Sequence, residues 1–414
     1  MYVGKKVTRV DAHDKAMGRT RYTDDLCDKS AYIIRVLHST IANGRVISID
    51  TSEAEKIPGV VKIFTCFDLK KKHYFPTAGH PWSTDPSHQD VADRLIMTER
   101  VRFYGDDIGA VVAEDEVAAA QALRAIKVEY EEYPFGKDGQ DAMKEDAPQI
   151  HENYPGNVLK HTTIRKGNYE EAIREPGLIK VEGWYSTPTV QHCHIENFIC
   201  TAQMEGERIR MPSSTQIPHI VRRVVGQALG IDWGRVQIIK PYIGGGFGNK
   251  QDVLYEPLCA WVCMNLGGHL VKLDVPREET FVSNRVRHAI RSHIVSWVRP
   301  DGTFAARKLE AFSDQGAYAS HGHSICAKGV GAFPQLYPCD NIEADGYTVF
   351  TNKPAAGAMP GYGIPQAMWA VECHTDDVAA KIGMDPIAFR RKNLMPVGFQ
   401  DEFSKNELYS DTFN

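Results

Sequence analysis

The chain has 414 residues, of which 43% are hydrophobic and 24% charged, as in an ordinary soluble globular protein. Its 48 basic and 53 acidic residues give a net charge of −5 without a basic stripe, which argues against a nucleic-acid partner. No apolar run approaches the roughly 18 residues of a membrane helix, and residues 1–15 lack the apolar core of a signal peptide. The sequence therefore predicts a cytoplasmic protein with no membrane partner, long enough for two or three domains with their own cores.

The first region, from about residue 18 to 133, predicts one α/β unit. Residues 106–113 form an apolar run suited to a buried strand. Asp115 and Glu116 precede an alanine-rich stretch, and acids at that place favour the start of a short helix over 117–124. Apolar residues then alternate with charged ones over 126–130, which is typical of a half-buried strand.

A polar stretch rich in glycine, proline and acidic residues, 134–157, indicates a linker between two regions. The region after it mixes predicted strands with helices. One helix is expected to begin at Pro218 and to close at Gly230, and another to follow Pro365 and end at Gly383. Proline suits the first turn of a helix and glycine its left-handed end, so both boundaries have a physical reason.

A glycine-rich stretch, 243–251, follows an apolar run, 236–239, and precedes a segment that predicts a helix over about 252–266. Successive glycines allow close approach of a ligand, and N–H groups at a helix N-terminus bind an oxo group or phosphate. The phosphate-binding and dinucleotide-binding motifs do not fit, because Asn249 replaces a required glycine and Gln251 a required serine or threonine. Spacing alone supports a structural turn and a ligand loop equally.

Nine cysteines are scattered without a Cys-x2-Cys pair, so zinc ribbons and ferredoxin-type clusters have no support. Cys259 and Cys263 lie four residues apart, and a buried helix face explains them better than a ligand pair. Two histidine groups with two-residue spacing lack the carboxylate and cysteine of a metal set, so we interpret them as pocket-lining or buried side chains. They are His192 with His194, and His321 with His323.

Six segments in order resemble the large molybdenum-binding subunit of the xanthine dehydrogenase/aldehyde oxidase family of molybdenum hydroxylases, and bacterial xanthine dehydrogenase large subunits most of all. They are GRTRYTD (18–24), SSTQ (213–216), GGGFGNKQ (244–251), DQGAY (314–318), GAMPGYGIPQ (357–366) and GMDP (383–386) with Arg390 and Asn393. The resemblance implies an α+β chain. An N-terminal α/β-hammerhead domain would span residues 1–135, a linker 136–157, and the first half of a molybdopterin-binding region 158–414.

The resemblance also implies a cofactor and partners. The cofactor would be molybdenum–molybdopterin, plain or as the cytosine dinucleotide. A second molybdopterin-binding half would supply most remaining pterin contacts and a glutamate base, either from a partner subunit or from the rest of a longer polypeptide. FAD and [2Fe–2S] clusters would lie on further subunits.

The implied reaction is hydroxylation of a carbon in a nitrogen heterocycle, with water as the oxygen source. The heterocycle would be a purine such as xanthine or hypoxanthine. An aldehyde oxidoreductase subunit is the alternative within the enzymes. A non-catalytic cofactor-binding or assembly module is the alternative outside them.

The family's site residues carry over onto matching positions. Gln216 would hydrogen-bond the oxygen ligands of molybdenum, and Phe247 and Gly248, after Gly246, would offer backbone N–H groups to the cofactor. Gln216 and Phe247 are therefore the predicted catalytic residues, and with Pro360 they would lie around molybdenum without binding it directly.

Two further residues would contact the substrate. Gln251 stands where purine-oxidising relatives often carry a glutamate, and its amide would hydrogen-bond a heterocycle. Tyr362 matches an aromatic residue that stacks on the substrate ring, an interaction that contributes roughly 0.5–1.5 kcal/mol.

The sequence departs from the family at Pro360, where relatives commonly carry arginine; proline removes a cation and a backbone N–H. No cysteine lies between Cys339 and Cys373, which argues against the molybdenum–copper site of carbon monoxide dehydrogenases. The segment containing Glu196 would support the cofactor loops or contact substrate. Lys328 stands near a substrate-binding arginine of some relatives, although a solvated lysine is the favoured interpretation.

Overall fold

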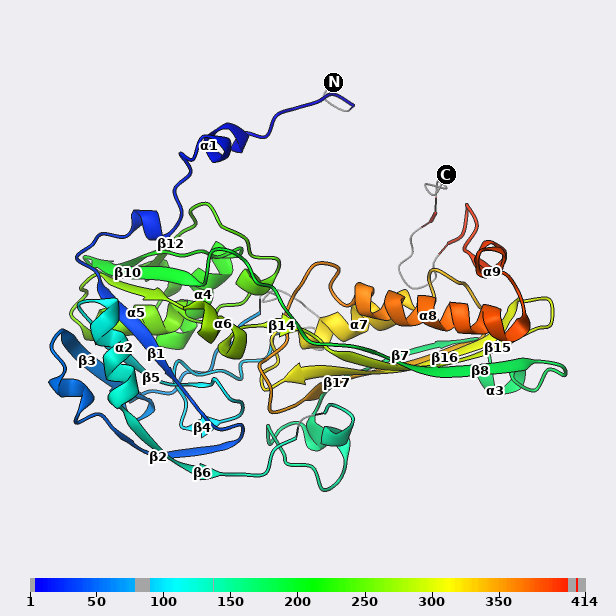
Figure 1. Ribbon diagram of the computed structural model, residues 1–414, viewed down its shortest axis with the longest axis horizontal. Coiled ribbons are helices and arrows are strands. Elements are labelled where there is room, and N and C mark those ends of the chain that lie inside the picture. Colours follow the sequence, from blue (N-terminus) through cyan, green and yellow to red (C-terminus); the bar gives the residue numbers. More distant parts are fainter. Residues whose placement is uncertain (1–3, 79–89, 137, 401–406, 409–414) are drawn as a thin grey trace.

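The computed structural model describes residues 4–78, 90–136, 138–400 and 407–408. The chain forms two parts that lie side by side along its longest axis (Figure 1). We call them the body, built on a seven-stranded sheet, and the arm, built on a five-stranded sheet. Helices and strands mix in both, which confirms the predicted α+β class. Within the described ranges, none of the helices combines the length and apolar character needed to span a membrane.

The sheet of the body takes strands from regions far apart in the sequence. Its order is β12-β11-β10-β13-β1-β5-β3. The strands are β1 (Tyr32–His38), β3 (Val60–Thr65), β5 (Asp107–Ala113), β10 (Ile199–Glu205), β11 (Arg208–Pro212), β12 (Val236–Ile239) and β13 (Val271–Asp274). Because β1 runs parallel to β13, with Tyr32 opposite Val271, the regions before and after the linker share one sheet.

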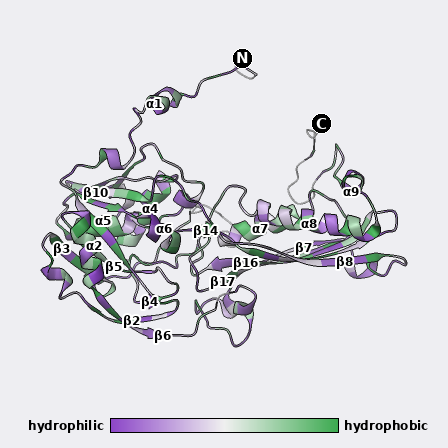
Figure 2. Ribbon diagram, in the orientation of Figure 1, coloured by the Kyte–Doolittle hydropathy of each residue, from purple (hydrophilic) through white to green (hydrophobic). Residues whose placement is uncertain are grey.

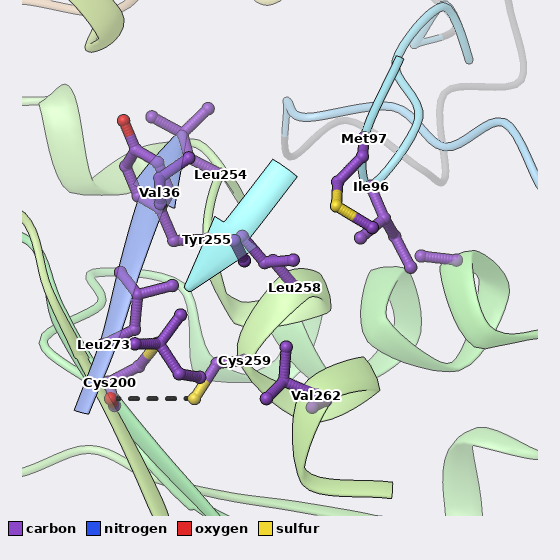
Figure 3. Close-up of a cluster of buried hydrophobic side chains, with 14 of the residues drawn as sticks. Val36, Ile96, Met97, Cys200, Leu254, Tyr255, Leu258, Cys259, Val262 and Leu273 are labelled. Carbon is purple, nitrogen blue, oxygen red and sulfur yellow. Dashed lines mark hydrogen bonds between the residues drawn. The ribbon is translucent and has the colours of Figure 1, made fainter. Parts of the chain in front are cut away.

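One apolar core joins these regions (Figure 3). Val36 on β1 and Leu273 on β13 belong to the same buried cluster. Cys259 faces β10, with its sulfur 3.8 Å from the Cys200 carbonyl oxygen. Cys259 and Cys263 are both buried in this core, which confirms the helix-face interpretation. The regions on either side of the linker therefore share this core, because β1 and β13 pair directly.

Helices and a small sheet complete the body. The helices are α2 (Glu116–Ala125), α4 (Pro218–Leu229), α5 (Glu256–Asn265) and α6 (Arg277–Ser283), and the small sheet holds β4 (Arg100–Val101), β2 (Gly44–Asp50) and β6 (Lys127–Glu132). The predicted strands at β5 and β6 and the predicted helix at α2 are confirmed. The Asp115 side chain accepts a hydrogen bond from the Ala118 N–H and so caps α2, as its sequence position indicated.

The arm is a sheet of order β7-β17-β16-β15-β8 with helices on one face (Figure 1). Its strands are β7 (Val158–Lys166), β8 (Ile179–Thr187), β15 (Ile290–Val298), β16 (Phe304–Gly316) and β17 (Ile342–Phe350). The helices α7 (Gly322–Ala332) and α8 (Ile364–Ile382) cover it and enclose a second apolar core. In Figure 2 the hydrophobic colour concentrates on β10 and α5 of the body, whereas hydrophobic and hydrophilic residues alternate along β8 of the arm.

The remaining elements are short. They are α1 (Ala12–Ala16), α3 (Tyr169–Ala172), α9 (Pro386–Asn393), β9 (Val190–Gln191) and β14 (Val286–Arg287). The helices predicted after Pro218 and Pro365 are confirmed as α4 and α8, and each ends at a left-handed glycine, Gly230 or Gly383. The helix predicted over about 252–266 is confirmed as α5, which begins later, at Glu256, after a short 3-10 turn over Asn249–Gln251 and a non-helical stretch over 252–255.

The polar stretch between the two regions is folded onto itself around Asn157. This buried amide donates to the carbonyls of Ala142 and Pro148, both at 2.9 Å, and accepts from the N–H of Ile150 at 2.9 Å. The stretch also contributes Ile150 to a small apolar cluster with Ala319 and Phe350 of the second region. The domain boundaries at this stretch remain a prediction.

Candidate active site

The glycine-rich loop lies between β12 and the 3-10 turn and has an unusual backbone. Gly245 and Gly248 both have φ near +100°, and Phe247 between them has φ of +54°. A phenylalanine in the left-handed region is strained by about 1 kcal/mol or more, so its surroundings must hold it there. The Phe247 ring is 52% exposed, and among the described residues no acceptor lies on its N–H group. The Phe247 N–H group is therefore available as a donor to a ligand.

Gln216 is the nearest brace of this loop. Its Oε1 accepts the Gly248 N–H at 3.0 Å, and its own N–H donates to the Lys250 carbonyl at 2.8 Å. A Cβ atom on Gly246 would overlap Gln216 Oε1, so any larger residue there would displace the Gln216 side chain. Because Oε1 accepts the Gly248 N–H, the Nε2 hydrogens remain for another acceptor, and the described part of the chain offers none. Of the two predicted backbone donors, Gly248 is occupied by Gln216 and Phe247 is not.

A buried ion pair fixes the other side of the loop. Lys250 Nζ lies 2.7 Å from Glu196 Oε2, and the same oxygen accepts the Gly244 N–H at 2.9 Å. Lys250 is fully buried, and burial lowers the pKa of its ammonium despite the Glu196 partner. The segment around Glu196 therefore supports the glycine loop, one of the two roles expected from the sequence.

The histidines of that segment are also structural. Burial lowers the pKa of His194 to about 4, so its ring is neutral. Its Nδ1–H donates to the Glu196 carbonyl at 2.5 Å, while Nε2 lies 3.2 Å from the Asn249 amide. His192 donates through Nε2 to the Ala358 carbonyl at 2.7 Å. The His194 ring is hydrogen-bonded through both nitrogens, whereas the His192 ring is buried and bonded through Nε2 alone within the described part of the chain.

A second loop, residues 357–363, closes against the first. A Cβ atom on Gly248 would overlap the Ala358 carbonyl, so the two loops touch backbone to backbone. Arg287 holds the second loop through two contacts. Its Nη2 donates to the Pro360 carbonyl at 2.8 Å, and its Nε lies 3.2 Å from the Met359 sulfur. Pro360 itself is exposed. A guanidinium thus lies against the loop in which relatives carry an arginine at position 360.

Tyr362 also has left-handed backbone, with φ of +48°. Its hydroxyl lies 3.0 Å from His321 Nδ1 and 2.8 Å from Ser324 Oγ, at the start of α7. His321 Nε2 lies 3.1 Å from Asp252 Oδ1. Burial raises the pKa of Tyr362 to about 12, so the hydroxyl keeps its proton. The hydroxyl anchors the ring. The prediction that Tyr362 stacks on the substrate did not include this role.

Asp252 connects the two loops. It is buried, pairs with the Arg285 guanidinium, and accepts from Ser320 Oγ at 2.7 Å. Burial opposes its ionisation, but Arg285 outweighs this and holds the pKa of Asp252 below its usual range. Gln251, directly before it, is half-buried in the 3-10 turn.

The N-terminus of α5 is not the anion site that the sequence suggested. The buried Glu256 carboxylate lies there and accepts from Ser213 Oγ at 2.8 Å and from the Leu254 N–H at 3.3 Å. Burial raises the pKa of Glu256. A carboxyl group of the chain itself occupies the place of the external anion, so the ligand donors of this region are those of the glycine loop and Gln216.

Gln216 contacts Gly246 and Gly248, and Gly248 lies against Ala358 in the loop that also carries Pro360 and Tyr362. Lys328 is exposed on α7, in agreement with the solvated interpretation. Sequence reasoning missed the residues that hold the site: they are Asp252, Arg285, Arg287 and Ser324. No local signal marked them, because each acts through a partner more than 30 residues away.

Two family models match the chain. Residues 17–134 match the aldehyde oxidase and xanthine dehydrogenase a/b hammerhead domain, and residues 150–394 match the molybdopterin cofactor-binding domain. The matches cover the body and arm with both loops of the candidate site.

Similar proteins agree with these matches. The chain is 44% identical over 403 residues to the putative xanthine dehydrogenase molybdenum-binding subunit XdhA of Escherichia coli K12, covering 97% of this chain and 53% of that protein. It is 31% identical to the nicotinate dehydrogenase large molybdopterin subunit of Eubacterium barkeri, covering 96% of this chain and 90% of that subunit. The aldehyde oxidoreductase from Desulfovibrio gigas has a similar structure, with TM-score 0.88 and 30% identity over 95% of this chain and 44% of that one.

The chain thus spans about half the length of XdhA, and its α/β hammerhead and cofactor-binding regions follow in the family's order. The chain belongs to the family of xanthine dehydrogenase-like molybdenum hydroxylases.

Proposed function

We propose that this chain holds one side of a molybdenum–molybdopterin cofactor and one side of the substrate in an enzyme that hydroxylates a nitrogen heterocycle, a purine such as xanthine or hypoxanthine. The observation that carries the proposal is the contact between Gln216, the glycine loop and the 357–363 loop. We expect an amide donor, a backbone donor and an aromatic ring to face one ligand region.

The donors suit a ligand with oxygen atoms. Gln216 is held through Oε1, which leaves its Nε2 hydrogens for an oxygen acceptor, and Phe247 adds a backbone N–H. Donors fixed before a ligand arrives stabilise charge on an oxygen without a cost of reorganisation. When bound, the cofactor supplies the oxidising centre for the substrate carbon. The residues of this chain orient it and stabilise negative charge beside it.

The substrate side depends on Tyr362 and Gln251. An aromatic ring favours a flat substrate by roughly 0.5–1.5 kcal/mol, and an amide can both donate to and accept from a heterocycle. The similarity to XdhA and to a nicotinate dehydrogenase subunit supports a heterocycle. The structural similarity to an aldehyde oxidoreductase favours an aldehyde as the second candidate substrate.

The chemistry requires an electron acceptor. Replacing a C–H hydrogen by a hydroxyl group from water releases two electrons and two protons. We propose that FAD and [2Fe–2S] clusters on partner subunits accept these electrons. We also propose that a second molybdopterin-binding half, on the same polypeptide or on another, completes the site.

The test is purification of the chain with the products of its neighbouring genes. Molybdenum and pterin content are measured first, and then turnover of xanthine, hypoxanthine and benzaldehyde in 18O-labelled water. We expect molybdenum in the assembly and label in a hydroxylated purine. Oxidation of benzaldehyde alone would favour the aldehyde alternative. Bound molybdenum without turnover of any of them would favour the cofactor-binding module.

A matched pair of glycine variants tests the cradle. Gly246→Ala places a Cβ atom onto Gln216 Oε1, so we expect it to lose most of the molybdenum. Gly331→Ala on α7 meets no atom within 4 Å and should retain it. Equal molybdenum content in the two variants would contradict the proposed site.

A further inference from the structure

We propose that His321 is a positioning residue for the substrate: it fixes the Tyr362 ring through the tyrosine hydroxyl and is itself fixed by Asp252. The inference rests on the proposed function, since it concerns how a flat heterocycle is recognised. It adds a residue group, His321 with Asp252 and Ser324, that a stacking ring alone does not require.

The first step is the need for an anchor. Tyr362 has φ of +48°, which is strained for a bulky side chain, and it follows Gly361 with φ of +89° in an exposed part of the loop. Such a backbone persists only where the surroundings hold it. The Tyr362 N–H donates to the Met359 carbonyl at 2.9 Å, but this bond does not set the direction of the ring. The hydroxyl does, because it reaches His321 and Ser324 on α7.

The second step is the orientation of the histidine. His321 Nε2 lies 3.1 Å from Asp252 Oδ1, and because a carboxylate oxygen only accepts, this contact favours the tautomer with a hydrogen on Nε2. In a neutral ring Nδ1 is then an acceptor, and the Tyr362 hydroxyl donates to it at 3.0 Å. Ser324 Oγ lies 2.8 Å from the same hydroxyl and 3.1 Å from the His321 carbonyl. The carboxylate thus fixes the tautomer that the tyrosine needs.

The third step is the rigidity of the carboxylate. Asp252 is buried with Arg285, and Ser320 Oγ donates to it at 2.7 Å. Gln251, the other predicted substrate contact, is its neighbour in the chain. One buried ion pair therefore positions both sides of the proposed substrate site, the aromatic ring through His321 and the amide through the backbone.

The chain contains a matched control for this group. Tyr185 on β8 also places its hydroxyl 3.0 Å from a histidine Nδ1, that of His374 on α8. This second pair lies between the sheet and helix of the arm, where His374 Nε2 lies 2.9 Å from Ser296 Oγ. The Tyr185 hydroxyl also donates to the Asp377 carboxylate, so Tyr185→Phe removes one bond more than Tyr362→Phe does, and only Tyr362 belongs to the proposed substrate site.

The experiment uses the assembled enzyme with Tyr362→Phe, His321→Gln and the double variant, beside Tyr185→Phe and His374→Gln. Steady-state kinetics are measured with the heterocycle that the wild type oxidises. Equilibrium binding of its hydroxylated product, uric acid if the substrate is xanthine, is measured by calorimetry without turnover. Thermal unfolding of each variant is recorded.

We expect Tyr362→Phe and His321→Gln each to weaken product binding and raise KM by about three- to tenfold, with kcat changed by less than about twofold. The double variant should be no weaker than the worse single variant, because both break the same link. The Tyr185 and His374 variants should lower the unfolding temperature and leave binding unchanged.

Additive effects in the double variant, or an equal loss of binding in the Tyr185 and His374 variants, would overturn the inference and leave the proposed function standing. Unchanged binding in Tyr362→Phe would do the same. A wild-type assembly that oxidises no heterocycle would overturn both.

Discussion

The two tyrosine–histidine pairs show how differently the candidate site and the arm are held. In both, the hydroxyl and Nδ1 are 3.0 Å apart. Beyond the ring, His321 meets the carboxylate of a buried ion pair, whereas His374 meets the neutral hydroxyl of Ser296. The tyrosine of the site has left-handed backbone, and Tyr185 lies in a regular strand.

The same contrast extends to the surroundings. The glycine loop contains residues in strained backbone conformations, and the Lys250–Glu196 ion pair helps to hold it. The arm is held by strand register and by an apolar layer under α7 and α8, and its buried Arg307 donates to the neutral Phe333 and Tyr337 carbonyls. A buried charge left without its partner is costly, whereas a neutral layer loses stability by degrees. We therefore expect the candidate site to lose much stability when one charged partner is removed. The arm should lose stability gradually when single side chains are changed.

The largest effect is expected from Lys250→Met. It leaves Glu196 without its partner beside the glycine loop, and breaking a buried pair in this way costs roughly 3–5 kcal/mol. The control in the arm is Lys308→Met, since the Lys308–Glu343 pair is partly exposed and its loss should cost about 1 kcal/mol or less. The free energy of unfolding in urea checks both. Equal losses would remove the contrast between site and arm.

The second prediction concerns pH. His38 on β1 is buried, and although burial opposes its charge, Asp107 and Glu279 raise its pKa to about 9. The raised pKa stabilises the fold fully below about pH 6.5, and this stability, roughly 3 kcal/mol, is lost as pH rises through about 9. His374 has the opposite sign, because burial lowers its pKa to about 3. Its contribution is present above about pH 6.5 and is lost as pH falls toward 3.

These two contributions are separated by His38→Gln and His374→Gln. The deficit of His38→Gln relative to wild type should shrink between pH 6.5 and 9.5, and that of His374→Gln should shrink between pH 6.5 and 4. Denaturation series at each pH provide the measurement. Deficits that do not change with pH would show that neither ring is held in the protonation state assigned to it.

The third prediction separates the two faces of one amide. Gln216→Ala should lower kcat by about tenfold or more and change KM less, because its proposed partner gains charge in the transition state. Gln216→Glu keeps an acceptor for the Gly248 N–H but loses the Nε2 donors, so it should be as impaired. Asn393→Ala removes an amide of the arm that bonds the Gly302 and Phe389 carbonyls and should leave kcat unchanged. A kcat within about twofold of wild type in Gln216→Ala would leave this residue a structural role alone.

The smallest effect is expected at Pro360, which is exposed at the rim. Pro360→Arg restores the family's cation without touching the Arg287 bond to the carbonyl of the same residue. Stability should change by less than about 0.5 kcal/mol. The ratio of kcat/KM for purine to that for aldehyde should rise by about two- to fivefold, equivalent to about 0.5–1 kcal/mol. An unchanged ratio would mean that position 360 does not determine specificity.

Local patterns in the sequence determined several of the elements. The strands β5 and β6, and the helices α2, α4 and α8, lie where alternation, helical spacing, capping acid or terminal glycine predicted them, because such signals act within a few residues. The order of six motifs identified the family for the same reason, since each motif is a contiguous segment. The helix predicted after the glycine loop is confirmed, but it begins at Glu256 rather than at about residue 252, because spacing does not fix the first residue of a helix.

Only the tertiary structure decided what holds the site. The pairing of β1 with β13 joins residues 32–34 to 271–273, and this merges two predicted regions into one sheet and core. Lys250 pairs with Glu196, which is 54 residues away, and Arg285 pairs with Asp252, which is 33 residues away. The Tyr362 hydroxyl contacts His321, which is 41 residues away. A charged or polar residue has no local mark of its partner, because its energy depends on burial and on a contact made only when distant segments meet.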